Sequence, residues 1–144
     1  MEKYNIRQLT LNDYEKYKIL INEFRKTEYT KIQFENTLDY INNFSEIWII
    51  EYNSDIITTG TIIYEKKFIY NNSILGHIED ICVKEEYKKM GFGKKMVKYL
   101  MTRAKEKGVY KITLDCNENN IEFYKKCNLE NRGYQMSQIS INIT

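Results

Sequence analysis

The sequence contains no proline, one histidine and only three cysteines among its 144 residues. A zinc site needs several Cys or His ligands. The single histidine, His77, and the lack of a Cys-x-x-Cys pair therefore argue against a zinc site. We interpret Cys82, Cys116 and Cys127 as unpaired thiols, which fits a reducing compartment. The lack of proline says little about function.

Long apolar runs and a strong charge of one sign are also missing. No stretch approaches the roughly 20 apolar residues of a membrane span, and the first residues do not resemble a signal peptide. The net charge of +2 is too small to indicate a nucleic-acid binder. A composition of 42% hydrophobic and 29% charged residues is typical of a globular protein. We therefore expect one cytoplasmic domain, residues 1–144, that binds neither nucleic acid nor membrane.

Apolar periodicity predicts the elements of the first half. A strand over 4–9 is followed by Thr10-x-x-Asp13, a capping-type start of an amphipathic helix that continues to Phe24. A second capping box begins at Thr30, and its helix places Phe34, Leu38 and Ile41 on one face. Strands over 47–52, 56–64 (which can run on to 68) and 74–83 are joined by short polar turns, which predicts an antiparallel meander.

The second half follows a different pattern. A helix over 92–107 is ended by Gly108, and a β-rich segment over 110–116 follows, which predicts a crossover between two parallel strands. A short helix over 119–127 then ends at Asn128, which can take the left-handed position that glycine usually fills. Residues 132–143 are β-compatible and predict a last strand. The order indicates an α+β fold with a mixed, mostly antiparallel sheet flanked by helices.

The glycine turn of residues 88–94 lies between a predicted strand and a predicted helix. Gly91 and Gly93 let the backbone approach a ligand closely, and the unpaired amides of a helix start attract anions. Lysines surround the turn: Lys88, Lys89, Lys94 and Lys95. The turn therefore fits a diphosphate group, although an ordinary turn with solvated lysines has the same sequence features.

This order of elements, together with the glycine turn, resembles the GNAT superfamily of N-acetyltransferases. In that family a Gln or Arg opens the pyrophosphate motif, where this chain has Lys88, which keeps the positive charge but loses the planar donor group. Four further segments are similar to glucosamine 6-phosphate N-acetyltransferases and are spread in the family's order over about half the chain: residues 67–70, 76–81, 110–116 and 120–126.

The resemblance implies a reaction as well as a fold. An acetyl group passes from acetyl-CoA to the amine of glucosamine 6-phosphate by direct attack in a ternary complex, without a metal and without a covalent enzyme intermediate. It also implies a homodimer. The cofactor site that it implies consists of Ile81, Cys82, Val83, Lys88, Lys89, Met90, Gly91, Phe92, Gly93, Asn120 and Tyr124.

Tyr124 is the implied acid for the departing thiolate, and the flanking match at Asn120 and Phe123–Lys125 favours this role over the alternative of one more packed tyrosine among 13. Cys82 has apolar neighbours and is interpreted as a buried residue that lends only its backbone. The implied catalytic residues are Tyr124, Asp115 and Glu79. The implied substrate residues are Lys67, Tyr70, Glu79, Asp80, Tyr110 and Lys111. The alternative for Glu79, Asp80 and Asp115 is an exposed strand face, and the alternative for Lys67 and Lys111 is a solvated surface lysine. His77 is expected to pack or to bond to the backbone rather than act as a base.

Two departures from the family concern the acceptor. Residues 134–141 lack the arginine that usually reaches the phosphate, and Arg132 is the nearest one. The segment between the first two helices lacks the family's glycine and carries Arg25 instead. Two alternatives therefore remain: an acetyltransferase for another small amine or a protein amine, and a non-catalytic acyl-CoA-binding module, which would not need Tyr124.

Overall fold

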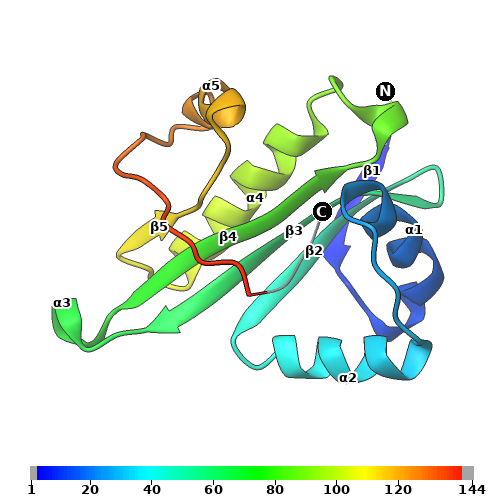
Figure 1. Ribbon diagram of the computed structural model, residues 1–144, viewed down its shortest axis with the longest axis horizontal. Helices are drawn as coiled ribbons and strands as arrows, with labels where there is room; N and C mark the ends of the chain where they lie inside the picture. The colour runs from blue at the N-terminus through cyan, green and yellow to red at the C-terminus, as the bar shows by residue number, and fades with distance from the viewer. Residues whose placement is uncertain (1–2, 141–144) are drawn as a thin grey trace. The chain divides into compact units, whose positions relative to one another are not determined.

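A mixed sheet forms the centre of the first of two compact units into which the chain divides, residues 1–114 and 115–144. The structure is a computed structural model that describes residues 3–140. Five strands lie in the sheet in the same order as in the sequence: β1 (Tyr4–Gln8), β2 (Ser45–Tyr52), β3 (Asp55–Lys66), β4 (Ile74–Val83) and β5 (Lys111–Thr113). Pairing is antiparallel from β1 to β4 and parallel between β4 and β5, as predicted (Figure 1).

Helices cover both faces of this sheet (Figure 1). The connection from β1 to β2 contains η1 (Leu11–Asp13), α1 (Tyr14–Phe24) and α2 (Lys31–Ile41); β3 and β4 are joined through α3 (Ile69–Asn72); and η2 (Glu85–Tyr87) and α4 (Phe92–Glu106) follow β4. Thr59 contacts Tyr17 of α1, whereas the next residue, Gly60, faces α4. Because successive strand residues point to opposite faces, α1 and α4 lie on opposite sides of the sheet.

The predicted apolar faces of the helices form the core. Under α1 and α2 the buried cluster consists of Leu9, Tyr17, Leu20, Phe34, Leu38, Ile47, Ile49, Ile56 and Cys82. Beneath α4 the side chains of Met96, Val97, Leu100 and Ala104 are fully buried. Each large apolar side chain buried in this way contributes on the order of 1.5–3 kcal/mol. The 3.6-residue period is therefore a reliable guide to both layers.

Both predicted helix starts are confirmed. The Asp13 carboxylate accepts a hydrogen bond from the Thr10 N–H at 2.8 Å. The Thr30 hydroxyl accepts from the Gln33 N–H at 3.1 Å, and the Gln33 side chain accepts from the Thr30 N–H at 2.8 Å. These bonds satisfy amides that would otherwise lack partners at the helix starts, so the sequence signal has a direct physical cause.

The second unit contains η3 (Glu118–Asn120) and α5 (Ile121–Lys125), where the sequence predicts one helix over 119–127. Asn128 has φ of 68°, so its predicted left-handed conformation is confirmed. The Asn128 N–H donates to the Lys125 carbonyl at 3.0 Å and the Leu129 N–H donates to the Tyr124 carbonyl at 3.1 Å. This pair of bonds is the Schellman arrangement that ends helices.

Two strand predictions need correction. The segment predicted as a strand over 110–116 is a strand only over Lys111–Thr113, because β4 pairs with it only from Leu75 to His77. The strand predicted over 132–143 is absent from residues 132–140, and residues 141–143 lie outside the described part of the chain. The apolar side chains of this segment are exposed, 96% for Tyr134 and 93% for Met136. A β-compatible sequence needs a neighbouring strand, and these residues have none there.

A buried carboxylate connects the sheet to α4. Glu46 of β2 accepts hydrogen bonds from Trp48 Nε1 at 3.1 Å, from the Tyr64 hydroxyl at 3.2 Å and from Arg103 Nη2 at 2.5 Å. Burial by itself raises the pKa of Glu46, but the hydrogen bonds from Arg103 and Trp48 offset this effect and lower the pKa below its ordinary value.

This network gives the first prediction. A carboxylate whose pKa is lower when folded stabilises the protein above its unfolded pKa of about 4.3, and the stabilisation is lost as the pH falls through the folded pKa. Glu46→Gln should cost about 1–3 kcal/mol of unfolding free energy at pH 7, because Arg103 loses its charged partner. The cost should shrink at pH 4. Urea unfolding at both pH values measures this.

The matched control is Glu106→Gln, which removes the other carboxylate on Arg103, 3.2 Å away and 59% exposed. An exposed pair contributes little, so this variant should stay within about 0.5 kcal/mol of the parent at both pH values. Equal losses in the two variants would contradict a special role for Glu46.

Candidate donor and acceptor site

The outer edge of β4 loses its strand partner half-way along its length. The parallel ladder joins Leu75 to Lys111, Gly76 to Ile112 and His77 to Thr113, and within the described residues it goes no further. β4 itself continues to Val83. The backbone groups on this edge after His77 can therefore bind an extended ligand, in the way that a sheet edge accepts an added strand. Ile81, Cys82 and Val83, predicted to hold the donor, lie on this stretch.

A β-bulge lies on the same stretch of β4. Thr59 pairs with Cys82 and Thr61 with Glu79, so Asp80 and Ile81 together oppose the single residue between them on β3. Asp80 has φ of 52°, the left-handed conformation. Bulges of this kind increase the local twist and are frequent beside active sites. The bulge turns the backbone of β4 just where the donor thioester is expected.

The predicted glycine turn has the geometry of an anion site. Gly91, with φ of 89°, caps the start of α4, and the Lys95 N–H donates to the Gly91 carbonyl at 3.1 Å. The amides of Phe92, Gly93 and Lys94 precede this bond and so have no intrahelical partner. A Cβ atom at Gly91 would meet nothing within 4 Å, so the space beside the turn is open. A diphosphate can approach these amides and the positive end of the helix dipole.

The side chains around the turn differ in their surroundings. Lys88, the first residue of the motif, forms an ion pair with Glu85 at 2.8 Å. Lys95 lies over the ring of Tyr4, with Nζ 5.3 Å from its centre. Phe92 is only 6% exposed and packs against three tyrosines from β1, β2 and η2: Tyr4, Tyr52 and Tyr87. The side chain of Phe92 thus anchors the helix start, and its backbone amide is the part that a ligand can reach.

Cys82 matches its interpretation as a structural residue. Its side chain is buried in the core beneath α1 and α2. Burial raises the pKa of the Cys82 thiol to about 11, so the thiolate is scarce near neutral pH. Cys82 and Cys116 are free thiols.

Lys111, a predicted substrate residue, shares one face of the sheet with Glu65 and Leu75. In the ladder Glu65 pairs with Leu75, and Leu75 pairs with Lys111, so these residues point to the same side. Glu65 is a residue that the sequence analysis missed. Its carboxylate lies 2.9 Å from His77 Nε2 and 3.5 Å from Lys67 Nζ. His77 therefore contacts a carboxylate rather than packing or bonding to the backbone, and that expectation was wrong.

The turn between β3 and β4 brings Tyr70 to Tyr110, with their ring centres 4.7 Å apart. Lys111 Nζ lies 5.9 Å from the centre of the Tyr110 ring. Tyr70 and the two asparagines after it have positive φ, which is costly for residues other than glycine and is often found at functional sites. The structure thus gathers Tyr70, Tyr110 and Lys111, whereas Glu79 lies four residues beyond Leu75 on β4, about 13 Å along the strand.

The remaining predicted residues belong to the second unit. Asp115 is exposed, and its Oδ2 accepts a hydrogen bond from Gln135 Nε2 at 3.2 Å. Asn120 is exposed at the start of α5. Tyr124 is half-buried against the Phe123 ring, 4.9 Å away. Burial raises the pKa of the Tyr124 hydroxyl, and the thiols of Cys116 and Cys127 act in the same direction. The hydroxyl thus keeps its proton near neutral pH, as an acid must. Its contact with the donor stays a prediction.

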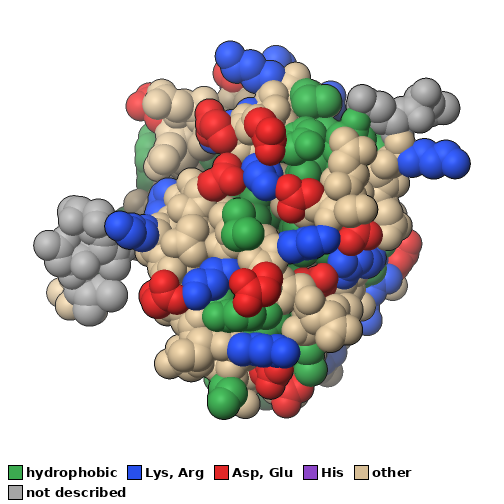
Figure 2. Space-filling view, turned by 90° about the vertical axis from the view of Figure 1, so that its right-hand side faces the viewer, with side chains coloured by type: hydrophobic (Ala, Val, Ile, Leu, Met, Phe, Trp, Pro, Cys, Tyr) green, Lys and Arg blue, Asp and Glu red, His purple; other side chains and the backbone are tan. Residues whose placement is uncertain are grey.

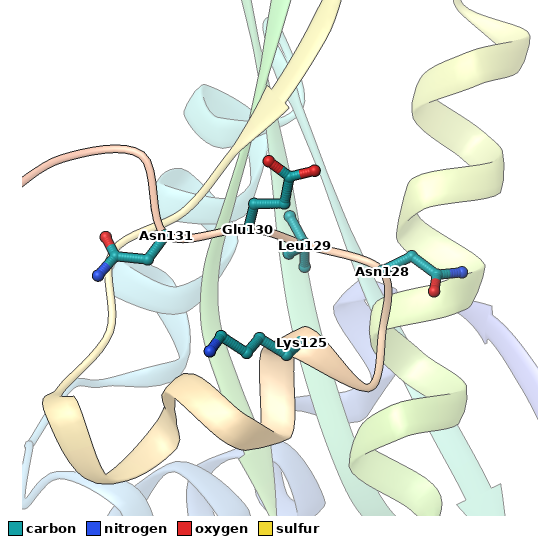
Figure 3. A pocket seen from close by; sticks show the side chains of 5 residues that line it. All are labelled: Lys125, Asn128, Leu129, Glu130 and Asn131. Atoms are coloured by element: carbon teal, nitrogen blue, oxygen red, sulfur yellow. The ribbon is translucent and has the colours of Figure 1, made fainter.

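Hollows on the surface lie apart from the predicted residues. One of about 560 Å³ lies in the second unit and is lined by Lys125, Asn128, Leu129, Glu130 and Asn131. Figure 3 shows the Lys125 ammonium, from α5, and the Glu130 carboxylate, from the segment after it, pointing in different directions. The hollow contains no predicted site residue. The predicted donor groups are a strand edge and a helix start, which offer backbone groups rather than an enclosed cavity.

Figure 2 shows basic and acidic side chains interspersed over one face of the molecule. Over residues 3–140 no three His, Cys, Asp or Glu side chains gather in a way that could hold a metal ion. Within the same residues no helix combines the length and the apolar character that a membrane crossing requires.

The open strand edge and the glycine-capped helix define an N-acyltransferase fold. The chain belongs to the acetyltransferase (GNAT) family, whose model matches residues 6–129. It is 35% identical over 139 residues to glucosamine 6-phosphate N-acetyltransferase 1 of Dictyostelium discoideum, covering 92% of this chain and 88% of that one.

Solved structures agree. The crystal structure of glucosamine-6-phosphate N-acetyltransferase from Arabidopsis thaliana superposes with a TM-score of 0.92 at 34% identity, covering 97% of this chain and all of that one. A predicted acetyltransferase from Clostridium acetobutylicum, solved with acetyl-CoA, has the same fold at 20% identity, with a TM-score of 0.72 over 95% of this chain and 96% of that one. The predicted fold class and family are therefore confirmed.

The glycine turn gives the second prediction. Gly91→Ala should weaken acetyl-CoA binding about tenfold, because alanine disfavours the left-handed φ of 89° and the turn must move. Isothermal titration with acetyl-CoA measures this.

Gly108→Ala is the matched control, since Gly108 also has positive φ, 78°, and open space around its missing Cβ, but lies at the other end of α4. Both variants should lose about 1 kcal/mol of stability, and only Gly91→Ala should lose affinity. An equal loss of affinity in both variants would show that the turn has no special role.

Proposed function

We propose that the protein transfers the acetyl group of acetyl-CoA to the amine of glucosamine 6-phosphate, giving N-acetylglucosamine 6-phosphate. Two findings support this proposal. The chain has the donor-site features of its family, and relatives named for this reaction are about 35% identical to it over nearly the whole chain. The open edge of β4 after His77, followed in sequence by the glycine-capped start of α4, is the observation that carries the donor half of the proposal.

The donor is held mainly by backbone groups. The edge of β4 at Ile81–Val83 binds the pantetheine arm and polarises the thioester carbonyl, and the free amides at the start of α4 bind the diphosphate. Lys89, Met90 and Asn120 complete this set. Such binding tolerates Lys88 in place of the family's Gln or Arg, because amides rather than that side chain contact the diphosphate.

The acceptor amine attacks the carbonyl carbon directly. A sugar amine beside electron-withdrawing oxygens is less basic than a lysine amine, so a substantial fraction is neutral near pH 7. Glu79, Asp80 and Asp115 orient it and its neighbouring hydroxyls. As the new C–N bond forms, the C–S bond breaks, the amine loses a proton and the Tyr124 hydroxyl protonates the departing thiolate.

Lys67 and Lys111 are the proposed partners of the substrate phosphate. Lys111 stands on the same sheet face as Glu65, whose carboxylate already pairs with Lys67 and His77. The ion pair between Glu65 and Lys67 must break before Lys67 can bind the phosphate. The internal pairing, together with the missing arginine in residues 134–140, is the observation that favours a second candidate: acetylation of another small amine or of a protein amine.

The family resemblance also supports a homodimer without a metal cofactor, and the composition of the chain favours a cytoplasmic protein without nucleic-acid or membrane partners. Light scattering of the purified protein tests the dimer directly.

The third prediction tests the acceptor. Free-thiol release from acetyl-CoA should be fast with glucosamine 6-phosphate and at least tenfold slower with glucosamine, spermidine or a lysine peptide, because only the first carries a phosphate for the lysines. Thiol release with another of these amines would support the proposed donor site and reject glucosamine 6-phosphate as the substrate. Binding of acetyl-CoA without thiol release by any amine would indicate a non-catalytic binding module.

The same assay with Tyr124→Phe separates an enzyme from a binding module. Its kcat should fall about a hundredfold or more while its affinity for acetyl-CoA stays within about twofold, because the hydroxyl acts on the leaving group. Tyr99→Phe, which removes a hydroxyl from α4 outside the site, is the control and should keep the parent kcat. An unchanged kcat in Tyr124→Phe would refute its role as the acid.

A further inference from the structure

We propose that Gly60 is a positioning residue for the acetyl-binding stretch of β4: its missing side chain makes the space that holds Ile81 and thereby sets the shape of the bulge. The proposal rests on the donor site described under the proposed function. It assigns a role in that site to a residue on a different strand, one that makes no contact with the ligand through a side chain.

Two residues of β4 have to fit opposite one residue of β3. The ladder pairs Thr59 with Cys82 and Thr61 with Glu79, which leaves Gly60 facing both Asp80 and Ile81. Asp80 adopts φ of 52° within this bulge. An extra residue in one strand bends that strand, and the direction of the bend depends on where its side chains can pack.

Gly60 supplies the space for one of them. A Cβ atom at this position would lie 2.7 Å from Ile81 Cδ1, 2.8 Å from Leu100 Cδ1 and 2.9 Å from Met96 Cγ. Carbon atoms in contact are normally 3.5–4.0 Å apart. The positive-φ glycines of the described chain are Gly91 and Gly108, so Gly60 is required by space and not by backbone conformation. The Ile81 side chain fills the volume that any other residue at position 60 would occupy.

The opposite face of β3 resists movement. The Thr59 hydroxyl donates to the Trp48 carbonyl at 3.0 Å and pairs with the Tyr17 hydroxyl at 3.2 Å, and both interactions are buried. Shifting β3 toward α1 would break them and leave polar groups without partners, which is costly. A side chain at position 60 must therefore displace the side chains of Ile81, Leu100 and Met96, and Ile81 is the one that belongs to the bulge.

Displacement of Ile81 moves the backbone that faces the ligand. The peptide groups on either side of Ile81 lie beyond His77, the last residue of β4 that pairs with β5 within residues 3–140. Catalysis by aligned donors is sensitive to small displacements, and an error of about 1 Å can cost about a hundredfold in rate. The role of Gly60 is therefore distinguishable from ordinary packing, since it acts on the rate and on recognition of the acetyl group.

The test compares Gly60→Ala with Gly76→Ala. Gly76 also faces α4, but a Cβ there would lie at 3.3 Å or more from its neighbours, and it is outside the bulge. We expect Gly60→Ala to lower kcat about tenfold or more and to reduce the preference for acetyl-CoA over CoA in direct binding. Gly76→Ala should keep both within about twofold. Thermal unfolding of each variant records the loss of stability separately.

Rescue separates positioning from packing. Ile81→Val removes the Cδ1 atom that a Cβ at position 60 would meet on β4, and Leu100→Val removes the nearer of the two overlapping atoms on α4. In the Gly60→Ala background the first change should restore most of the kcat measured for Ile81→Val alone. The second should restore stability without kcat. Equal rescue of kcat by both, or a folded Gly60→Ala with the parent kcat, would overturn the proposal.

Two further measurements test the proposal if Gly60→Ala does not fold or if the parent protein has no activity. If Gly60→Ala does not fold, Ile81→Ala and Leu100→Ala take its place, because they remove side-chain atoms from the same space on the β4 side and the α4 side. Only Ile81→Ala should lower kcat about tenfold. An equal loss of kcat in both variants overturns the proposal. If the parent turns over no amine, the proposed function fails, and the ratio of the dissociation constants for acetyl-CoA and CoA then decides the role of Gly60.

Discussion

The proposed donor site depends on the point at which β4 stops pairing with β5. β4 is paired with β3 along nearly its whole length but with β5 over only three residues. Backbone N–H and C=O groups seek partners, and a strand edge that lacks a neighbour is a binding surface by default. The two helix layers hold the sheet from both faces, so the opening persists without a ligand. The bulge at Asp80 and Ile81 and the glycine-capped start of α4 follow directly along the chain.

Much of this could be predicted from local sequence. β4 is observed with the bounds predicted for it, 74–83, and α4 begins at Phe92 as expected. Both helix starts were recognisable because Thr10 and Thr30 are followed three residues later by an acceptor side chain. The glycine turn was recognisable because only glycine adopts the φ of Gly91 without cost. Each of these signals arises within a few residues of the chain.

Features that depend on distant residues could not be predicted. The length of β5 depends on how far β4 runs beside it, and the segment after Arg132 is β-compatible yet has no strand partner in the described residues. The contact of Glu65 with His77 joins two strands, so neither residue suggests it alone. Gly60 resembles any strand glycine in the sequence, and its meaning comes from Ile81 and α4. The acceptor half of the site also depends on contacts between residues distant in sequence, so the sequence predicts it less fully than the donor half.

Backbone recognition of the donor is the central claim, and amide hydrogen exchange with and without acetyl-CoA tests it most directly. Acetyl-CoA should slow exchange at Ile81–Val83 and at the first three amides of α4, Phe92, Gly93 and Lys94, by about tenfold or more at a hundred times the dissociation constant. Amides on β1, remote from both, should exchange at unchanged rates. Tight binding without protection at the β4 edge and the start of α4 would contradict the account.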